Sequence, residues 1–143
     1  MDIARALPLD EPRIDVPWHL TEQGFLQLLR DNPPQKVTNG HYQLRCRLLG
    51  LPESPLHFHF QPRTHGRLTQ VEFYRNPQHQ KKKGFDELQR ALEDRLGPPT
   101  RREDAAMDGV RPAFWQLGKI SVSHEYYYHG DHHEKVLFTT RAA

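Results

Sequence analysis

Apolar and polar residues alternate in three successive segments, and no other feature of this chain constrains its fold as strongly. The segments cover residues 41–49, 56–61 and 68–74, and the connections between them, 50–55 and 62–66, are short. Successive side chains of a β-strand point to opposite faces of the sheet, so a period of two predicts half-buried strands. Connections this short favour antiparallel neighbours. The expected apolar sides hold Tyr42, Leu44, Cys46, Leu48, Leu56, Phe58, Phe60, Thr69, Val71 and Phe73.

A second run of strands is predicted towards the C-terminus, over residues 112–117, 119–128 and 134–140. In the middle strand one face carries Ile120, Val122, His124, Tyr126 and Tyr128, and the other carries Ser121, Ser123, Glu125 and Tyr127. Val136 and Phe138 resume the apolar face after a turn at 129–133. Together the two runs predict an antiparallel sheet with one apolar face.

One helix is expected before each run of strands. Thr21 can cap the first helix, which Asn32-Pro33-Pro34 ends because proline cannot continue a helix. The second helix is predicted over 84–96, and Gly97 stops it. Each helix has a single apolar stripe, so we expect both to pack on the same apolar face of the sheet. The expected core comprises Phe25, Leu28, Phe58, Phe60, Phe73, Phe85, Leu88, Leu92 and Val122.

The predicted fold class is therefore α+β, with the order helix–three strands–helix–three strands. Residues 1–17 are acidic and interrupted by prolines, and they are interpreted as an N-terminal arm before a single domain at 18–143. The phrases Gly24-Phe25-x-x-Leu28 and Gly84-Phe85-x-x-Leu88 open the two helices in the same way. They suggest an internal duplication of 20–75 and 84–140, although any two such units look alike.

The element order and the phrase Leu96-Gly97-Pro98-Pro99 resemble the tandem helix-plus-sheet modules of beta-lactamase-inhibitory-protein-like domains and small bacterial immunity proteins. The resemblance implies a non-catalytic protein that binds another protein through a sheet face, in a toxin-neutralising, immunity-like role. No cofactor is predicted.

Length, charge and cysteine content narrow the function classes. A chain of 143 residues fits one domain. The single Cys46 excludes an internal disulfide, and no apolar stretch is long enough to span a membrane, so a cytoplasmic location without a membrane partner is predicted. Twenty basic and eighteen acidic residues give a net charge of +2 with mixed signs, which makes nucleic acid an improbable partner.

The polar sides of the first three strands carry the main candidate site. If these strands are neighbours, their polar residues form one patch that combines arginine, histidine and tyrosine, residue types that favour protein interfaces. The predicted partner-binding residues are Arg45, Arg47, His57, His59, Glu72 and Tyr74. The alternative is an ordinary solvated sheet face. A homodimer is also left open.

His124 suggests a different site and therefore a different function, because it lies on the same predicted apolar strand face as Tyr126. These two residues could line a pocket for a small ligand or an enzyme reaction. The competing interpretation is a core histidine that is hydrogen-bonded within the protein, as buried polar groups normally are. No serine or cysteine nucleophile pairs with His124 by spacing.

Two further motifs are weak candidates. One is a group of residue types that can bind zinc: His129, Asp131, His132 and His133. The dipeptide Gly130-Asp131 is also common in hairpin turns, so no metal is predicted. The basic stretch 75–83 allows weak nucleic-acid binding, whereas lysines in such a loop are more often simply solvated.

Overall fold

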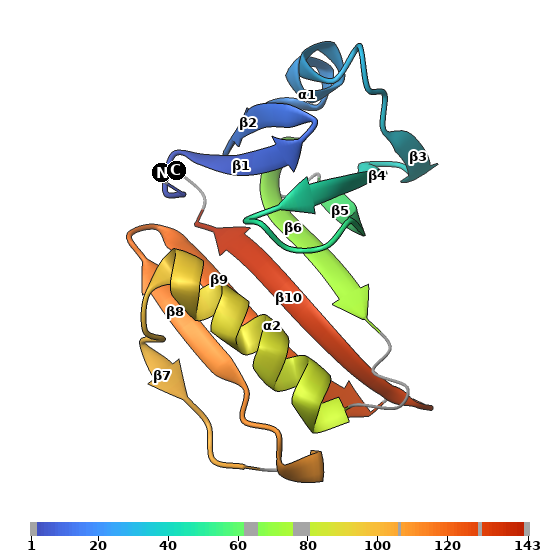
Figure 1. The fold of residues 1–143 in the computed structure, drawn as a ribbon. Helices are drawn as coiled ribbons and strands as arrows, with labels where there is room; N and C mark the ends of the chain where they lie inside the picture. Colours follow the sequence, from blue (N-terminus) through green and yellow to red (C-terminus); the bar gives the residue numbers. More distant parts are fainter. Residues whose placement is uncertain (1–2, 62–65, 76–80, 106, 129, 142–143) are drawn as a thin grey trace.

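A computed structural model describes residues 3–61, 66–75, 81–105, 107–128 and 130–141, and it shows one ten-stranded antiparallel sheet with two α-helices (Figure 1). The fold is α+β and dominated by the sheet. The helices are α1 (Glu22–Leu28) and α2 (Lys81–Leu96), with a short 3-10 turn η2 (Met107–Gly109). The strands are β1 (Ala6–Glu11), β2 (Arg13–Pro17), β3 (Gln35–Thr38), β4 (His41–Leu48), β5 (Ser54–Gln61), β6 (Arg67–Arg75), β7 (Arg101–Arg102), β8 (Ala113–Leu117), β9 (Ile120–Tyr128) and β10 (His132–Thr140).

The strand order is β2-β1-β4-β5-β6-β10-β9-β8-β7, and β3 also pairs with β4. At the centre of the sheet β6 pairs with β10 along its length, from Arg75 opposite Glu134 to Gln70 opposite Thr139. β6 ends the N-terminal half of the chain and β10 ends the C-terminal half. Their pairing therefore joins the two halves into one sheet, as Figure 1 shows. Internal duplication stays a prediction.

The period-two alternation corresponds to the burial pattern of the sheet. One cross-strand row contains Tyr42, Phe58, Val71, Phe138, Val122 and Trp115. All six are buried. An irregularity between His59 and Phe60 shifts the register, so Leu68 enters the core in place of the expected Thr69. The predicted core residues are buried except Leu28, which is partly buried, while the neighbouring Leu29 at the helix end is fully enclosed.

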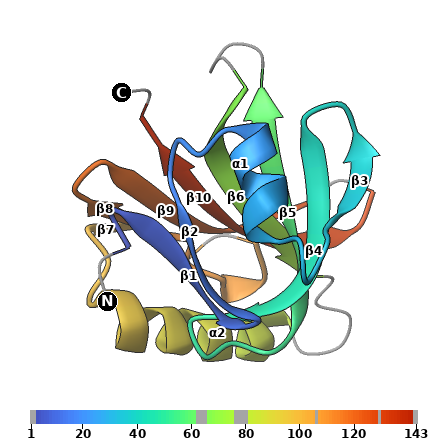
Figure 2. The same ribbon diagram turned by 90° about the horizontal axis from the view of Figure 1, so that it is seen from above.

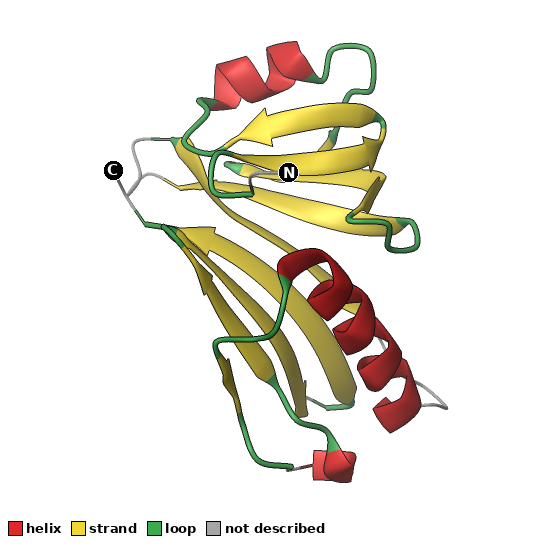
Figure 3. Ribbon diagram, turned by 60° about the vertical axis from the view of Figure 1, so that its left-hand side comes forward, coloured by secondary structure: helices red, strands yellow, loops and turns green. Residues whose placement is uncertain are grey.

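Side chains at the helix ends and in the core connect each helix to the sheet. The Thr21 side chain accepts a hydrogen bond from Gly24 N at 3.0 Å, which confirms the predicted cap of α1. The Phe25 ring lies 4.8 Å from that of Phe58. At the end of α2, Trp115 Nε1 donates to the Gly97 carbonyl at 2.9 Å. Figures 2 and 3 show α1 near the N-terminal half of the sheet and α2 along the strands of the C-terminal half.

Within residues 3–17, which fall in the predicted N-terminal arm, β1 and β2 form a hairpin and β1 extends the sheet at β4. Leu7, Leu9 and Val16 are buried, and Trp18 Nε1 donates to the Ile3 carbonyl at 2.9 Å. Prolines interrupt the alternation of polar and apolar residues in this segment, so the sequence pattern did not predict β1 and β2. The predicted order of helix and three strands in each half was therefore incomplete.

Two other strands were missed for a different reason. β3 is exposed along its whole length, and β7 has only two residues, both arginine. Short polar edge strands have no apolar side, so periodicity does not reveal them. Among the described residues, no helix combines the length and the apolar content that crossing a membrane requires.

Candidate functional site on the polar face of the sheet

The side of the sheet opposite the core row forms the polar face. Its cross-strand rows contain Gln43, His57, Glu72, Leu137 and Ser123, and, next to them, His41, His59, Gln70, Thr139 and Ser121. Most of these side chains are half-buried, whereas the alternate residues on the same strands are enclosed. Tyr74, at the end of β6, is 40% exposed. The polar face is therefore partly accessible to solvent, most of all at Tyr74.

The structure brings four of the six predicted partner-binding residues into one polar cluster. His59 Nε2 lies 3.0 Å from Glu72 Oε1, and the ring of His57 lies 5.9 Å from that of Tyr74. Two residues that were not predicted complete the polar cluster. The His41 ring stacks on His59 at 4.4 Å, and Lys135 Nζ lies 3.8 Å from Glu72 Oε2.

Of the two cluster residues that were not predicted, His41 could have been identified from the sequence, whereas Lys135 could not. His41 opens the alternating segment of β4 on its polar side, so the same periodicity identifies it. Lys135 lies on β10 opposite Tyr74 on β6. Its place depends on the pairing of two strands that are far apart in the chain, and no local pattern reports that pairing.

Glu72 is the electrostatic centre of the polar cluster, although its side chain lies on the open face. It is only 6% exposed, because its neighbours surround it. Burial by itself would raise the pKa of Glu72, but hydrogen bonds from His59 and Tyr74 and the charge of Lys135 outweigh it and lower the pKa to about 2. Glu72 is thus a fixed carboxylate near neutral pH, and it is unsuited to proton transfer.

The three histidines of the polar cluster lie next to one another. His41 Nε2 and His57 Nδ1 are 2.7 Å apart. Burial lowers the pKa of His41, and the neighbouring His59 and His57 lower it further. Burial also lowers the pKa of His57, against the opposing charge of Glu72. His41 and His57 therefore resist protonation in the folded protein.

We expect the free energy of unfolding to fall as the pH drops below about 6.5, the ordinary histidine pKa. In that range the unfolded chain takes up protons on His41, His57 and the buried His124 that the folded protein does not, so acid favours unfolding. Glu72 does not contribute there, because its stabilisation is lost only as the pH falls below its ordinary value of 4.5. Urea unfolding between pH 7.5 and 5.5 measures the effect. The His41→Gln variant should show a flatter pH profile, and parallel profiles would contradict the assignment.

Arg45 and Arg47 lie on the polar face but outside the polar cluster. They lie towards the C-terminal end of β4, away from His41, and Arg47 is opposite Glu11 of β1. Arg45 Nε lies 3.7 Å from Glu53 Oε1, and Arg47 Nε donates to the Leu51 carbonyl at 3.4 Å. All six predicted partner-binding residues thus lie on the same side of the sheet, but they form two groups: the arginines at one end and the histidine-rich polar cluster at the centre.

A cavity of about 470 Å³ extends the polar face across the C-terminal half. It is lined by Thr100, Arg101, Phe114, Trp115, Gln116, Ser121, Val122, Ser123, Glu125, Leu137 and Thr139. Leu137 in its wall is the cross-strand partner of Glu72, so the cavity adjoins the polar cluster. The guanidinium of Arg101 lies 4.2 Å from the centre of the Phe114 ring. This wall offers both apolar contact and hydrogen-bonding groups.

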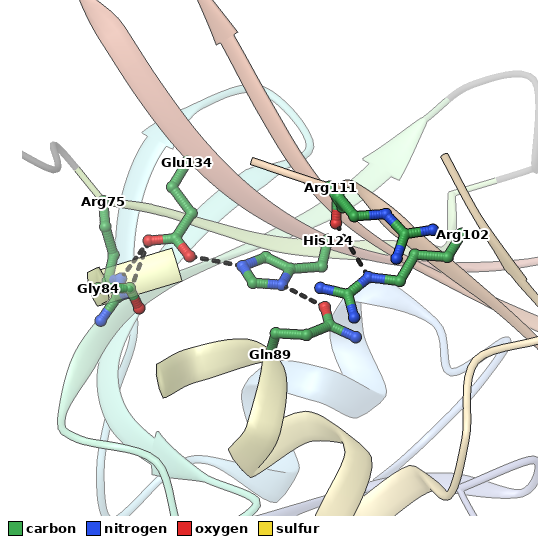
Figure 4. Close-up of polar contacts among 7 residues, drawn as sticks. All are labelled: Arg75, Gly84, Gln89, Arg102, Arg111, His124 and Glu134. Atoms are coloured by element: carbon green, nitrogen blue, oxygen red, sulfur yellow. Dashed lines mark hydrogen bonds and ion pairs between the residues drawn. The ribbon is translucent and has the colours of Figure 1, made fainter. Parts of the chain in front are cut away.

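His124 belongs to the core. Its Nε2 lies 2.5 Å from Glu134 Oε2, and its Nδ1 lies 2.8 Å from Gln89 Oε1, as Figure 4 shows. Phe85 stacks on the ring at 3.7 Å. Burial lowers the pKa of His124, although Glu134 opposes this shift. Both ring nitrogens are thus engaged inside the protein, an arrangement that suits a structural role.

Tyr126, the other residue of the proposed pocket, donates to Asp108 Oδ2 at 2.7 Å. It points towards the helix side of the sheet, like His124, and its ring also stacks on His132. The structure therefore adds no support to a ligand pocket at these two residues.

The candidate metal ligands are dispersed. His129 lies outside the described residues. His132 and His133 are adjacent on β10 and point to opposite faces, where they stack on Tyr126 and Tyr127 respectively. Across the described ranges, no group of three or more histidine, cysteine, aspartate or glutamate side chains has the geometry to hold a metal ion.

The basic stretch 75–83 is also divided. Residues 76–80 lie outside the described ranges, and α2 begins at Lys81 instead of the expected residue 84. Arg75 donates to Glu134 Oε1 at 2.7 Å and to the Gly84 carbonyl at 2.9 Å. Lys82 pairs with Asp86 at 2.6 Å. These contacts engage two of the basic residues that weak nucleic-acid binding through this stretch would use.

Comparison with known proteins assigns no relative to the chain: no protein-family model, no curated protein and no solved structure matches it. The function therefore has to be argued from the polar face itself.

Proposed function

We propose that this chain is a non-catalytic protein-binding module whose partner docks on the polar face of the sheet. The observation that carries the proposal is the polar cluster. It places an exposed tyrosine, three histidines and an ionised carboxylate on an open face, and hydrogen bonds and ring stacking hold them in place. Pre-organised side chains lose little conformational entropy when a partner binds.

The composition of the polar face favours a protein as the partner. Arginine and tyrosine are over-represented among residues that dominate binding energy at protein interfaces. The polar face offers Arg45 and Arg47 at one end, Tyr74 and Glu72 at the centre, and the 470 Å³ cavity beyond them. A partner side chain that enters the cavity would supply an anchor, and the charges of both signs would set its orientation.

A non-catalytic role also fits the single cysteine. Cys46 is buried in the core, and burial raises the pKa of its thiol to about 12, so a reactive thiolate does not form at neutral pH. The narrower hypothesis of a toxin-neutralising, immunity-like protein in the bacterial cytoplasm rests on the resemblance in element order. Packing of both helices on the same apolar face of the sheet is a separate prediction, which follows from the single apolar stripe of each helix.

Replacement of Tyr74 by alanine tests the proposal. We expect the variant to bind its partner more weakly by more than about 2 kcal/mol, roughly a 30-fold loss of affinity, while it stays folded and loses only about 1 kcal/mol of stability with the hydrogen bond to Glu72. The partner is first captured from the native cytoplasm with the full chain and identified, and the affinity is then measured by calorimetry with both proteins purified.

The matched control is Tyr128→Ala, because Tyr128 is also an exposed tyrosine of the sheet but lies on the helix side. It should bind like the wild type. Arg47→Ala provides a second test at the arginine end. Wild-type affinity in both Tyr74→Ala and Arg47→Ala would place the interaction surface elsewhere.

A further inference from the structure

The cavity of about 470 Å³ on the polar face has an apolar floor. Leu137 of β10, Ser123 of β9 and Phe114 of β8 are cross-strand neighbours, so their side chains form one row across the cavity. Leu137 and Phe114 are both half-buried. They offer apolar contact to the stem of a side chain that enters from a docked protein.

The two serines that line this cavity have their hydroxyl protons engaged. Ser123 Oγ donates to Glu125 Oε2 at 2.8 Å, because a carboxylate is an acceptor. Ser121 Oγ donates to Gln116 Oε1 at 2.8 Å. The Gln116 amide is fixed in this orientation, since its Nε2 donates to the Gly118 carbonyl at 2.7 Å. Each serine oxygen therefore has only lone pairs left, and it can bind a ligand only as an acceptor.

Glu125 adds a negative charge to the same wall. Its carboxylate accepts from the neutral Ser123 hydroxyl, and within the described ranges no ion pair joins it to a basic side chain. Its cross-strand neighbour is Lys135, whose Nζ lies 3.8 Å from Glu72 Oε2 instead. The Glu125 side chain is half-buried, so water screens its charge less than on an open surface.

The electrostatic potential beside Glu125 is negative. Tyr127 is the following residue on the same side of β9, and burial raises the pKa of its phenol. The charges of Glu72 and Glu125 raise this pKa further, because they oppose the formation of a phenolate. A positive charge that enters here is therefore attracted.

Arg101 also lines the cavity, but a neighbouring acid offsets its charge. Its guanidinium lies 4.2 Å from the centre of the Phe114 ring, and its Nη1 lies 3.8 Å from Glu103 Oε1. Arg101 thus has both an aromatic ring and a carboxylate beside it, whereas the charge of Glu125 has no such complement. The cavity as a whole favours a ligand that donates hydrogen bonds and carries a positive charge.

We propose that the cavity accepts a basic side chain, lysine or arginine, of the protein that docks on the polar face, and that the cation pairs with Glu125. The proposal rests on the proposed function and specifies a partner that presents a basic residue at its interface. The two serine oxygens accept further hydrogen bonds from the cation, and its aliphatic stem covers the apolar floor. An acidic side chain that pairs with Arg101 is the alternative occupant.

NMR titration of the full chain with N-acetyl-arginine amide, and separately with N-acetyl-lysine amide, tests the proposal without a partner protein. N-acetyl-citrulline amide is the neutral control, because its side chain resembles that of arginine in shape but has no charge. We expect saturable shifts of the Leu137 methyl and Ser123 amide signals with at least one basic probe, and much smaller shifts with citrulline. Glu125→Gln should weaken binding of that probe about tenfold, the loss expected for a charge-assisted hydrogen bond.

Glu87→Gln is the charge-matched control variant, because Glu87 is exposed on α2 and does not line the cavity. It should bind the probes like the wild type, and so should Arg101→Gln. Signals that move with neither basic probe would overturn the proposal, as would equal binding by Glu125→Gln and the wild type. Tighter binding of N-acetyl-glutamate amide, lost in Arg101→Gln, would show that the occupant is acidic.

The captured partner separates this proposal from docking itself. Glu125→Gln should weaken the partner about tenfold as well. If Tyr74→Ala weakens the partner and Glu125→Gln does not, the polar face remains the docking surface and the basic side chain is disproved. If Tyr74→Ala, Arg47→Ala and Glu125→Gln all bind like the wild type, both proposals fail.

Discussion

Replacement of Glu134 by alanine is expected to lower the free energy of unfolding by about 3–5 kcal/mol. The Glu134 carboxylate is buried and pairs with Arg75 at 2.6 Å and with His124 at 2.5 Å. Its removal leaves the buried His124 ring without its acceptor and Arg75 without its counter-ion. Because 36% of the Arg75 side chain is exposed, water can partly resolvate that charge, which favours the lower end of the range.

Urea unfolding at pH 7.5 measures this loss. The control is Asp86→Ala, which removes the exposed ion pair with Lys82 and should change stability by less than about 1 kcal/mol. Glu134→Gln should fall between the two, because the amide keeps an acceptor for one partner but no charge. A loss in Glu134→Ala as small as that in Asp86→Ala would mean that the buried network does not hold β6, β9 and β10 together.

Replacement of Phe25 by alanine is expected to destabilise the protein by a similar amount, about 3–5 kcal/mol, through loss of apolar contact and formation of a cavity. Phe25 is the fully buried residue of α1, and its ring lies 4.8 Å from Phe58 and 5.0 Å from Phe60. With only seven residues, α1 cannot be stable without this contact.

Leu26→Ala is the matched control, because Leu26 is the next residue of the same helix and is exposed. Its effect should stay within about 0.5 kcal/mol. Thermal and urea unfolding of both variants give the comparison, and circular dichroism reports whether α1 is retained. Equal stabilities of the two variants would show that α1 contributes little to the core.

The two sides of the sheet thus carry different chemistry. The helix side combines an apolar core with one buried network, in which Glu134 links Arg75 of β6 to His124 of β9. The polar face exposes Arg45 and Tyr74 and holds the Glu72 carboxylate beneath its neighbours. A substitution on the helix side should therefore act on stability, and one at Tyr74 should act on binding.

Local patterns in the sequence predicted the elements of the core well. The alternation in β4, β5, β6, β9 and β10 identified each strand and, except at Thr69 of β6, its buried side, because a period of two follows directly from strand geometry. The cap at Thr21 and the proline stop at 32–34 identified α1 in the same way. The N-terminal hairpin, β3 and β7 were missed, because prolines or exposed polar residues remove the apolar side that reveals a strand.

Apart from the exchange of Leu68 for Thr69 at the irregularity of β6, the sequence by itself determined which strand residues of the predicted core face inwards, because that choice follows the order of polar and apolar residues along one strand. Only the tertiary structure decided which strands are neighbours. The pairing of β6 with β10 brings Lys135 to Glu72 on the polar face and Glu134 to Arg75 on the helix side. Such pairing depends on the packing of the whole sheet under its helices, and periodicity assigns a residue to a face without naming the strand beside it.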